Sequence, residues 1–210
     1  TEVVNLGAAD ITLSQVGATK ATADVSLDNS GNVNVNMTTS AANAIKGAAN
    51  TGAAYAGAEA QVNDITLSNA GSVTVNVGDY VSYTGSANGI VAAKATDVTL
   101  NVNSSKNAAT KPAQQSQFNS KLDVAKATSV TINSQGDTTL LANSDLDAAQ
   151  TVSIVAGGAV DLDTGNVSLK AAANVTLTGE EKTSKVILGT VGTATTDYDV
   201  TVNATGLKAG

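Results

Sequence analysis

The sequence predicts an all-β fold, a parallel β-solenoid (β-helix) of short Val-Thr-Leu strands with loop or short-helix excursions. Three observations favour it. Apolar and polar residues alternate in short segments along the 210-residue chain. Several of these segments align with one another, and they recur at a nearly constant spacing. Alternation with a period of two indicates strands, and a recurring unit of roughly 20 to 50 residues indicates a repeat architecture.

Alternating segments led by valine or isoleucine mark the expected strands. β-branched Val, Ile and Thr suit a half-buried pleated surface, whereas the same spacing on a helix would spread the apolar residues around its circumference. The inward Val, Leu and Ile would stack on their equivalents in neighbouring strands, with Thr, Asn and Ser facing water. Clear examples are Ile11-Thr12-Leu13, Val73-Thr74-Val75-Asn76-Val77, Val98-Thr99-Leu100-Asn101-Val102 and Val175-Thr176-Leu177.

Aligned copies of the strand pattern share a glycine. Residues 25–35 match residues 65–75, and partial copies begin at Ile11, Val130 and Val152. A sharp corner between strands needs glycine either for a positive φ or because no room is left for a Cβ atom. We therefore expect corners at the glycines that follow the leading apolar residue by six positions, which are Gly17, Gly31, Gly71, Gly136 and Gly158.

The spacing of strand starts predicts three strands per turn of roughly 20 to 25 residues. One such turn leads from Val152 through Val160 and Val167 to Val175, and Val130 precedes Val152 by nearly the same interval. Ile11 and Val33 are separated by the same interval as Val130 and Val152, which predicts that they stack. Turns stacked about 4.8 Å apart would make a rod roughly 40 Å long.

The alternative architecture is a β-sandwich with hairpins at this spacing. Two-residue hairpin turns favour Asn-Gly or Asp-Gly. The Ser-Gly and Ala-Gly pairs at Ser30-Gly31 and Ala70-Gly71 are weaker hairpin signals, so the solenoid is the favoured prediction.

Two segments interrupt the strand pattern. Residues 40–61 are rich in alanine with interspersed glycines, which predicts a short helix or an excursion loop. Residues 104–121 contain three lysines and Pro112, the single proline, and indicate a solvated insertion. Pro112 is the candidate boundary between two β-rich lobes, residues 1–111 and 112–210, unless the two form one continuous domain.

The residue types that are missing exclude several kinds of chemistry. The chain has no His and no Cys, and all eleven basic residues are Lys. It therefore lacks Ser-His-Asp and Cys-His nucleophiles and the ligands of zinc fingers and iron–sulfur clusters. A net charge of −7 opposes binding to nucleic acid or anionic membranes, and no apolar run is long enough for membrane insertion. We expect no catalytic residues, no bound organic cofactor and no enzyme activity.

Asp161 and Asp163 are the candidate metal ligands, with calcium as the metal. They stand two residues apart, so that on a strand both carboxylates would face one side. Two further pairs repeat the spacing, Asp145 with Asp147 and Asp197 with Asp199. The segment 157–161 resembles the glycine- and aspartate-bearing calcium repeat of RTX proteins, but it lacks the third glycine and a tandem array. The alternative is a solvated acidic face without a metal.

The strands, the corner glycines and the segment 165–171 resemble repeats of two protein families. One comprises bacterial surface-layer proteins of the RTX, type I secreted kind, and the other comprises filamentous-haemagglutinin-like adhesins with β-solenoid repeats. The resemblance implies a secreted structural protein at the cell surface that assembles with itself as a homo-oligomer, sheet or fibre, with cell-surface polysaccharide as a second partner. The alternative is an adhesin or carbohydrate-binding module, for which Tyr80 and Tyr83 are the candidate contact residues. A polysaccharide-degrading enzyme is less favoured.

Overall fold

Every secondary-structure element in the described part of the chain is a β-strand. The computed structural model describes residues 3–4, 8–15, 23–28, 31–39, 62–79, 81–83, 88–103, 116–179, 185–192 and 199–203. These ranges contain no helix that could span a bilayer. The prediction of an all-β fold is confirmed for the described residues.

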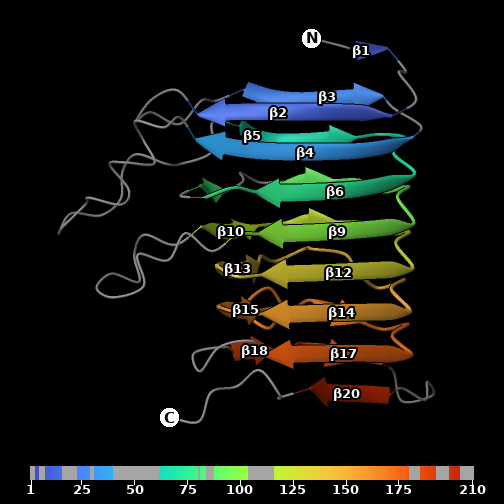
Figure 1. Cartoon of the computed structure of the whole chain (residues 1–210). Coiled ribbons are helices and arrows are strands. Elements are labelled where there is room, and N and C mark those ends of the chain that lie inside the picture. Colours follow the sequence, from blue (N-terminus) through green and yellow to red (C-terminus); the bar gives the residue numbers. More distant parts are fainter. Residues whose placement is uncertain are drawn as a thin grey trace, which may run out of the picture.

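An eight-stranded parallel sheet, the long sheet, runs through the molecule from β2 to β20 (Figure 1). Each strand follows its neighbour in the sheet in sequence order as well as in space. The strands are β2 (Ala9–Gln15), β4 (Asn32–Thr39), β6 (Ser72–Val77), β9 (Asp97–Val102), β12 (Ser129–Ser134), β14 (Thr151–Ala156), β17 (Asn174–Gly179) and β20 (Asp199–Asn203).

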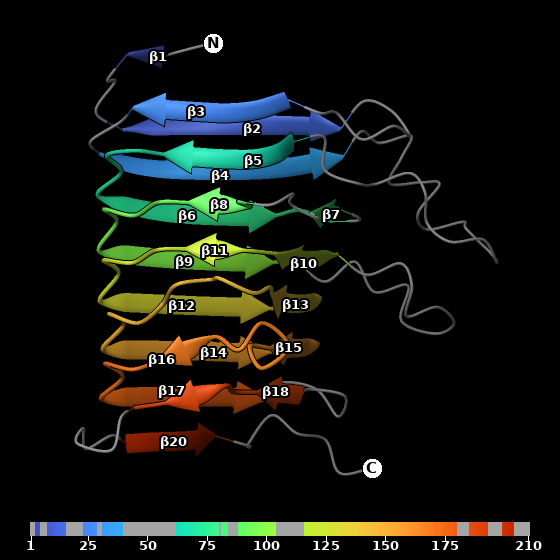
Figure 2. The ribbon, with the colours of Figure 1, turned by 180° about the vertical axis from the view of Figure 1, so that it is seen from behind.

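Two five-stranded sheets accompany the long sheet, and the view from behind shows both (Figure 2). The first short sheet contains β1 (Val3–Val4), β3 (Ala23–Asp28), β5 (Val62–Leu67), β8 (Ile90–Val91) and β11 (Leu122–Asp123). The second short sheet contains β7 (Ser82–Tyr83), β10 (Gln117–Ser120), β13 (Asp137–Leu140), β15 (Ala159–Asp161) and β18 (Lys185–Ile187). A two-stranded sheet pairs β16 (Ser168–Leu169) with β19 (Thr190–Val191).

The chain visits these sheets in a recurring order. From β5 to β13 it passes three times from the first short sheet to the long sheet and then to the second short sheet. All strand pairs of the described residues are parallel, for example β6 with β9 and β10 with β13. Hairpins join antiparallel strands, so the sandwich of hairpins weighed from the sequence does not describe these sheets.

The observed register confirms most of the predicted alignment. Val25 pairs with Ile65 and Val33 with Val73, as the match of residues 25–35 to 65–75 requires. Val152 pairs with both Val130 and Val175, as the spacing of strand starts predicts.

The predicted stacking of Ile11 on Val33 is wrong, because Ile11 pairs with Val35. Both valines lie on β4, two positions apart, and both are buried. A shift by two positions keeps the same side of the strand facing inward, so the apolar pattern does not reveal it.

The corner glycines were predicted to occupy one kind of corner, but the described ones occupy two. Gly31 and Gly71 lie between a strand of the first short sheet and a strand of the long sheet. Gly136 and Gly158 lie between the long sheet and the second short sheet. The repeated spacing therefore joins two different corners. Gly17 lies outside the described residues.

Alternate residues of the strands form one apolar core. In β6 and β12 every second side chain is buried and the others are half-buried. The buried side chains are mostly Val, Leu, Ile and Ala. Tyr83 and Phe118 face each other on the paired strands β7 and β10, with ring centroids 5.4 Å apart.

The predicted solvated insertion at 104–121 is wrong at its C-terminal end. Residues 117–120 form β10, and Ser116, Phe118 and Ser120 are fully buried. The rest of this segment up to residue 115, including Pro112, lies outside the described residues, as does the Ala-rich segment 40–61. Strands on both sides of Pro112 belong to the long sheet, in which β9 pairs with β12 along its whole length.

Candidate functional site

Asp161, the first candidate metal ligand, holds the turn that follows β15. Its Oδ1 atom accepts hydrogen bonds from the backbone N–H groups of Asp163 and Thr164, both at 2.9 Å, and its Oδ2 atom accepts one from the Thr164 hydroxyl at 2.8 Å. The backbone N–H of Thr164 lowers the pKa of Asp161 below its ordinary value, with further lowering from the Thr164 hydroxyl and the Asp163 N–H. The carboxylate is therefore ionised and held in place by its own turn.

Asp163, the second candidate, lies in that turn and not in a strand. β15 ends at Asp161, and Asp163 is exposed. The two carboxylates therefore do not share one side of a strand. The described residues contain no group of three or more His, Cys, Asp or Glu side chains placed to hold a metal.

In the pair Asp145 and Asp147, the side chain of Asp147 connects two segments of the chain. Asp147 accepts hydrogen bonds from Ser168 and Lys170, and its backbone N–H donates to Asp145 at 3.0 Å. Burial raises the pKa of Asp147, but the hydrogen bonds from Lys170 and Ser168 and the Lys170 charge outweigh it, and the pKa is lowered. Of the third pair, Asp199 lies in β20, and Asp197 is outside the described residues.

Tyr83 is a core residue, so it does not fit the contact role that the alternative of a binding module gave it. Its side chain is fully buried against Phe118. Burial, together with the negative charge of Asp64, raises the pKa of Tyr83 far above its ordinary value. Tyr80 lies outside the described residues. An aromatic surface for stacking on a sugar ring therefore has no support from Tyr83.

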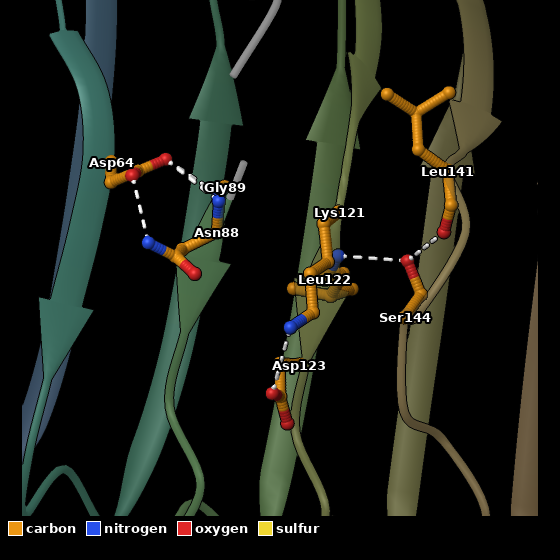
Figure 3. A network of polar contacts seen from close by, with 8 residues as sticks. All are labelled: Asp64, Asn88, Gly89, Lys121, Leu122, Asp123, Leu141 and Ser144. Carbon is orange, nitrogen blue, oxygen red and sulfur yellow. Dashed lines mark hydrogen bonds and ion pairs between the residues drawn. The ribbon is translucent and has the colours of Figure 1, made fainter. Parts of the chain in front are cut away.

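A buried carboxylate that the sequence analysis missed is Asp64, on β5 (Figure 3). It accepts hydrogen bonds from the Gly89 N–H at 2.7 Å, the Asn88 side-chain amide at 3.1 Å and the Asn88 N–H at 3.2 Å. Gly89 has a φ of +60°, which brings its N–H toward β5. The adjacent Asn88-Gly89 pair was the available signal, since Asn-Gly favours a turn in which the glycine adopts a positive φ.

The same side of the molecule carries a second set of contacts further along the stack of strands (Figure 3). Lys121 forms an ion pair with Asp123, with 3.2 Å between the charged atoms. Ser144 accepts a hydrogen bond from the Leu122 N–H at 3.0 Å and donates one to the Leu141 carbonyl at 2.8 Å. The bond between Leu122 and Ser144 joins two neighbouring segments, while the other two contacts are local.

Straight rows of polar side chains cover the outer face of the long sheet. Asn76 donates to Asn36 at 2.8 Å, Asn101 to Asn76 at 2.7 Å and Asn133 to Asn101 at 2.9 Å, which makes an asparagine ladder across four strands. A parallel row of hydroxyl groups lies two positions earlier on each strand, at Thr74, Thr99, Thr131, Ser153, Thr176 and Thr201. From β6 to β20 neither row holds a charged residue.

A charged ladder lies near the end of β3. Asn69 donates a hydrogen bond to Asp28, and Lys94 donates one to Asn69, so three segments of the chain are joined.

Comparison with known proteins adds no further assignment, since no family model, curated protein or solved structure matches the chain. In the described part of the chain, the polar side chains named above contact neighbouring strands and loops of the protein itself.

Proposed function

We propose that the chain is a parallel β-solenoid and serves as a structural protein of the cell surface, a self-assembling component of a surface layer or fibre. The eight-stranded sheet of matched parallel strands carries this proposal. Each turn of such a solenoid buries its apolar side only by stacking on its neighbours, as the units of repeat proteins do. Stacked turns extend in one direction, so the shape suits a building element of a larger structure.

The use of polar side chains supports a structural role. Asp64, Asp147, Asp161 and the asparagine ladder all hold neighbouring backbone segments or side chains of the protein itself. Two outer rows of the long sheet, the one with the asparagine ladder and the one with Thr99, repeat at the strand spacing of about 4.8 Å and carry no charge between β6 and β20. Secretion and the cell surface as location come from the resemblance to surface-layer proteins and adhesins.

The proposal is tested by light scattering over a dilution series. The expected result is an average mass that rises with protein concentration above the 20.7 kDa of one chain. Millimolar calcium is proposed to raise the assembled fraction by neutralising part of the −7 charge, with Asp161 and Asp163 as its ligands, and a chelator should reverse this effect. A chain that stays at the mass of a monomer at all concentrations, with and without calcium, would contradict self-assembly.

An adhesin or carbohydrate-binding module is the second candidate. The rows of hydroxyl and amide groups on the long sheet favour it, because these groups can exchange hydrogen bonds with sugar hydroxyls. Retention of the chain on a column of cell-surface polysaccharide, lost on replacing Thr99 and Thr131 by Ala, would support this function. Equal retention of the wild type and the double variant would contradict a role for these rows.

A further inference from the structure

The C-terminal end of the long sheet exposes the apolar side of its last strand. Val200 is 44% exposed and Val202 is 67% exposed, and these are the exposed large hydrophobic side chains of the described residues. Both lie on β20, which within the described residues pairs only with β17. An edge strand with exposed valines is a template for pairing with another strand.

These valines continue the inward rows of the protein. Val200 pairs with Val175, and Val202 pairs with Leu177. Val175 is 1% exposed because β20 covers it, whereas no described strand covers Val200. Among the described residues, the inward side of β20 is thus left uncovered at this end of the sheet.

The opposite end of the long sheet presents the complementary edge. β2 pairs only with β4 among the described residues, and its inward residues Ala9 and Ile11 are partly exposed. Ile11 packs against the core from this end. Because all strands run in the same direction, the free edge of β2 has the direction and polarity that the free edge of β20 needs for another parallel pair.

We propose that a second copy of the chain docks head-to-tail, with its β2 added to β20 as the next strand of the long sheet. This inference rests on the proposed function of self-assembly and names the surface that performs it. Placing Val202 against Ile11 of the second copy also places Val200 against Ala9, so the inward rows continue across the junction. The two surfaces differ, so the contact is heterologous and builds an open-ended filament.

The outward residues of the two edges are compatible in this register. Thr201 comes to lie opposite Asp10, where its hydroxyl can donate a hydrogen bond to the carboxylate. Within the protein, Asn34 makes the same kind of contact with Asp10 at 2.7 Å from the next strand. Asp199 comes to lie opposite Ala8, so no carboxylate of one copy faces a carboxylate of the other directly.

Sedimentation velocity of matched variants tests the docking surface. Val202→Lys places a charge at the junction and is expected to reduce the assembled fraction at least tenfold, while Thr151→Lys, at an exposed position of β14 in the middle of the sheet, leaves it unchanged. If the wild type assembles and Val202→Lys assembles equally well, head-to-tail docking is wrong and self-assembly by another surface stands. A wild type that is monomeric at all concentrations overturns both the docking and the proposed function.

Disulfide trapping tests the polarity of the contact, because the chain has no cysteine of its own. Facing residues on adjacent strands have Cα atoms about 5 Å apart, which suits a disulfide. We expect the single variants Asp10→Cys and Thr201→Cys to form cross-linked dimers when mixed under oxidising conditions, and little dimer separately. Dimers of Thr201→Cys alone, or no dimer in the mixture of two assembling variants, would overturn head-to-tail docking.

Discussion

At the scale of single residues, the corners at Gly136 and Gly158 require residues without a Cβ atom. A Cβ atom on Gly158 would lie 2.1 Å from the Gly136 carbonyl oxygen, and one on Gly136 would lie 2.0 Å from the Ser116 carbonyl oxygen. The glycines with positive φ among the described residues are Gly89 and Gly192. Of the two reasons for a corner glycine, the one that holds at Gly136 and Gly158 is that a neighbouring backbone segment leaves no room for a Cβ atom.

Gly158→Ala is expected to destabilise the protein by at least about 2 kcal/mol, because the added methyl group must push two backbone segments apart. Ser153→Thr is the matched control. It also adds one methyl group, but on the outer face in a row of threonines, and should change the free energy of unfolding by less than about 0.5 kcal/mol. Chemical denaturation measures both values, and an equal effect of the two changes would contradict the close approach at Gly158.

Asp161→Ala is expected to cost about 1 kcal/mol at neutral pH, since three donors of the turn lose their acceptor. The pKa of Asp161 is lowered in the folded protein. Its contribution to stability is therefore present above the unfolded pKa of about 3.9 and is lost as the pH falls through the lower, folded pKa.

Thermal melts of Asp161→Ala and the wild type should thus differ at pH 7 and converge on acidification below pH 4. Asp163→Ala is the control on the same turn, where the backbone N–H of residue 163 still reaches Asp161. A melting temperature that responds more to Asp163→Ala than to Asp161→Ala would contradict this account of the turn.

At the scale of the strand, the alternation of apolar and polar residues could be predicted from the sequence, whereas the pairing of residues between strands could be predicted only in part. Residues 25–35 and 65–75 could be aligned because apolar residues and a glycine coincide at several positions. The pairing of Ile11 with Val35 could not be found, because Val33 and Val35 are both valine and both face inward. β10 was missed because Gln117 and Asn119 are polar and the apolar pattern is reduced to Phe118.

Leu67→Asp is expected to unfold the protein or cost more than about 4 kcal/mol, because Leu67 is fully buried and a carboxylate there has no partner. Thr66→Asp, on the opposite side of the same strand, should cost less than about 1 kcal/mol. Circular dichroism melts of the two variants provide the measurement. Similar melting temperatures would contradict the period-two arrangement of β5.

Asn101→Ala is expected to destabilise the protein by about 1 to 2 kcal/mol, because it removes the hydrogen bonds to Asn76 and Asn133 from the middle of the ladder. Thr99→Ala lies on the same strand and the same outer face and should cost less. Denaturant titrations of both variants give the comparison. If Thr99→Ala proved the more costly change, the asparagine ladder would not be a source of stability.

At the scale of the whole molecule, the long sheet sets the direction in which the strands stack. Its eight strands at about 4.8 Å spacing span roughly 34 Å, near the length expected from the sequence. Stacking was predictable from the regular recurrence of strand starts along the chain. The exposed valines of β20 were not predictable as an end, because Val200 and Val202 follow the same pattern as the buried pairs before them.

Cryo-electron microscopy of the assembled protein tests the central claim, self-assembly of stacked parallel strands, most directly. Head-to-tail stacking of eight strand layers predicts a filament with an axial subunit repeat of roughly 38 Å and a strand spacing of about 4.8 Å along the same axis. Particles that remain dispersed at every concentration would contradict the account, as would an assembly whose strands run along the direction of growth.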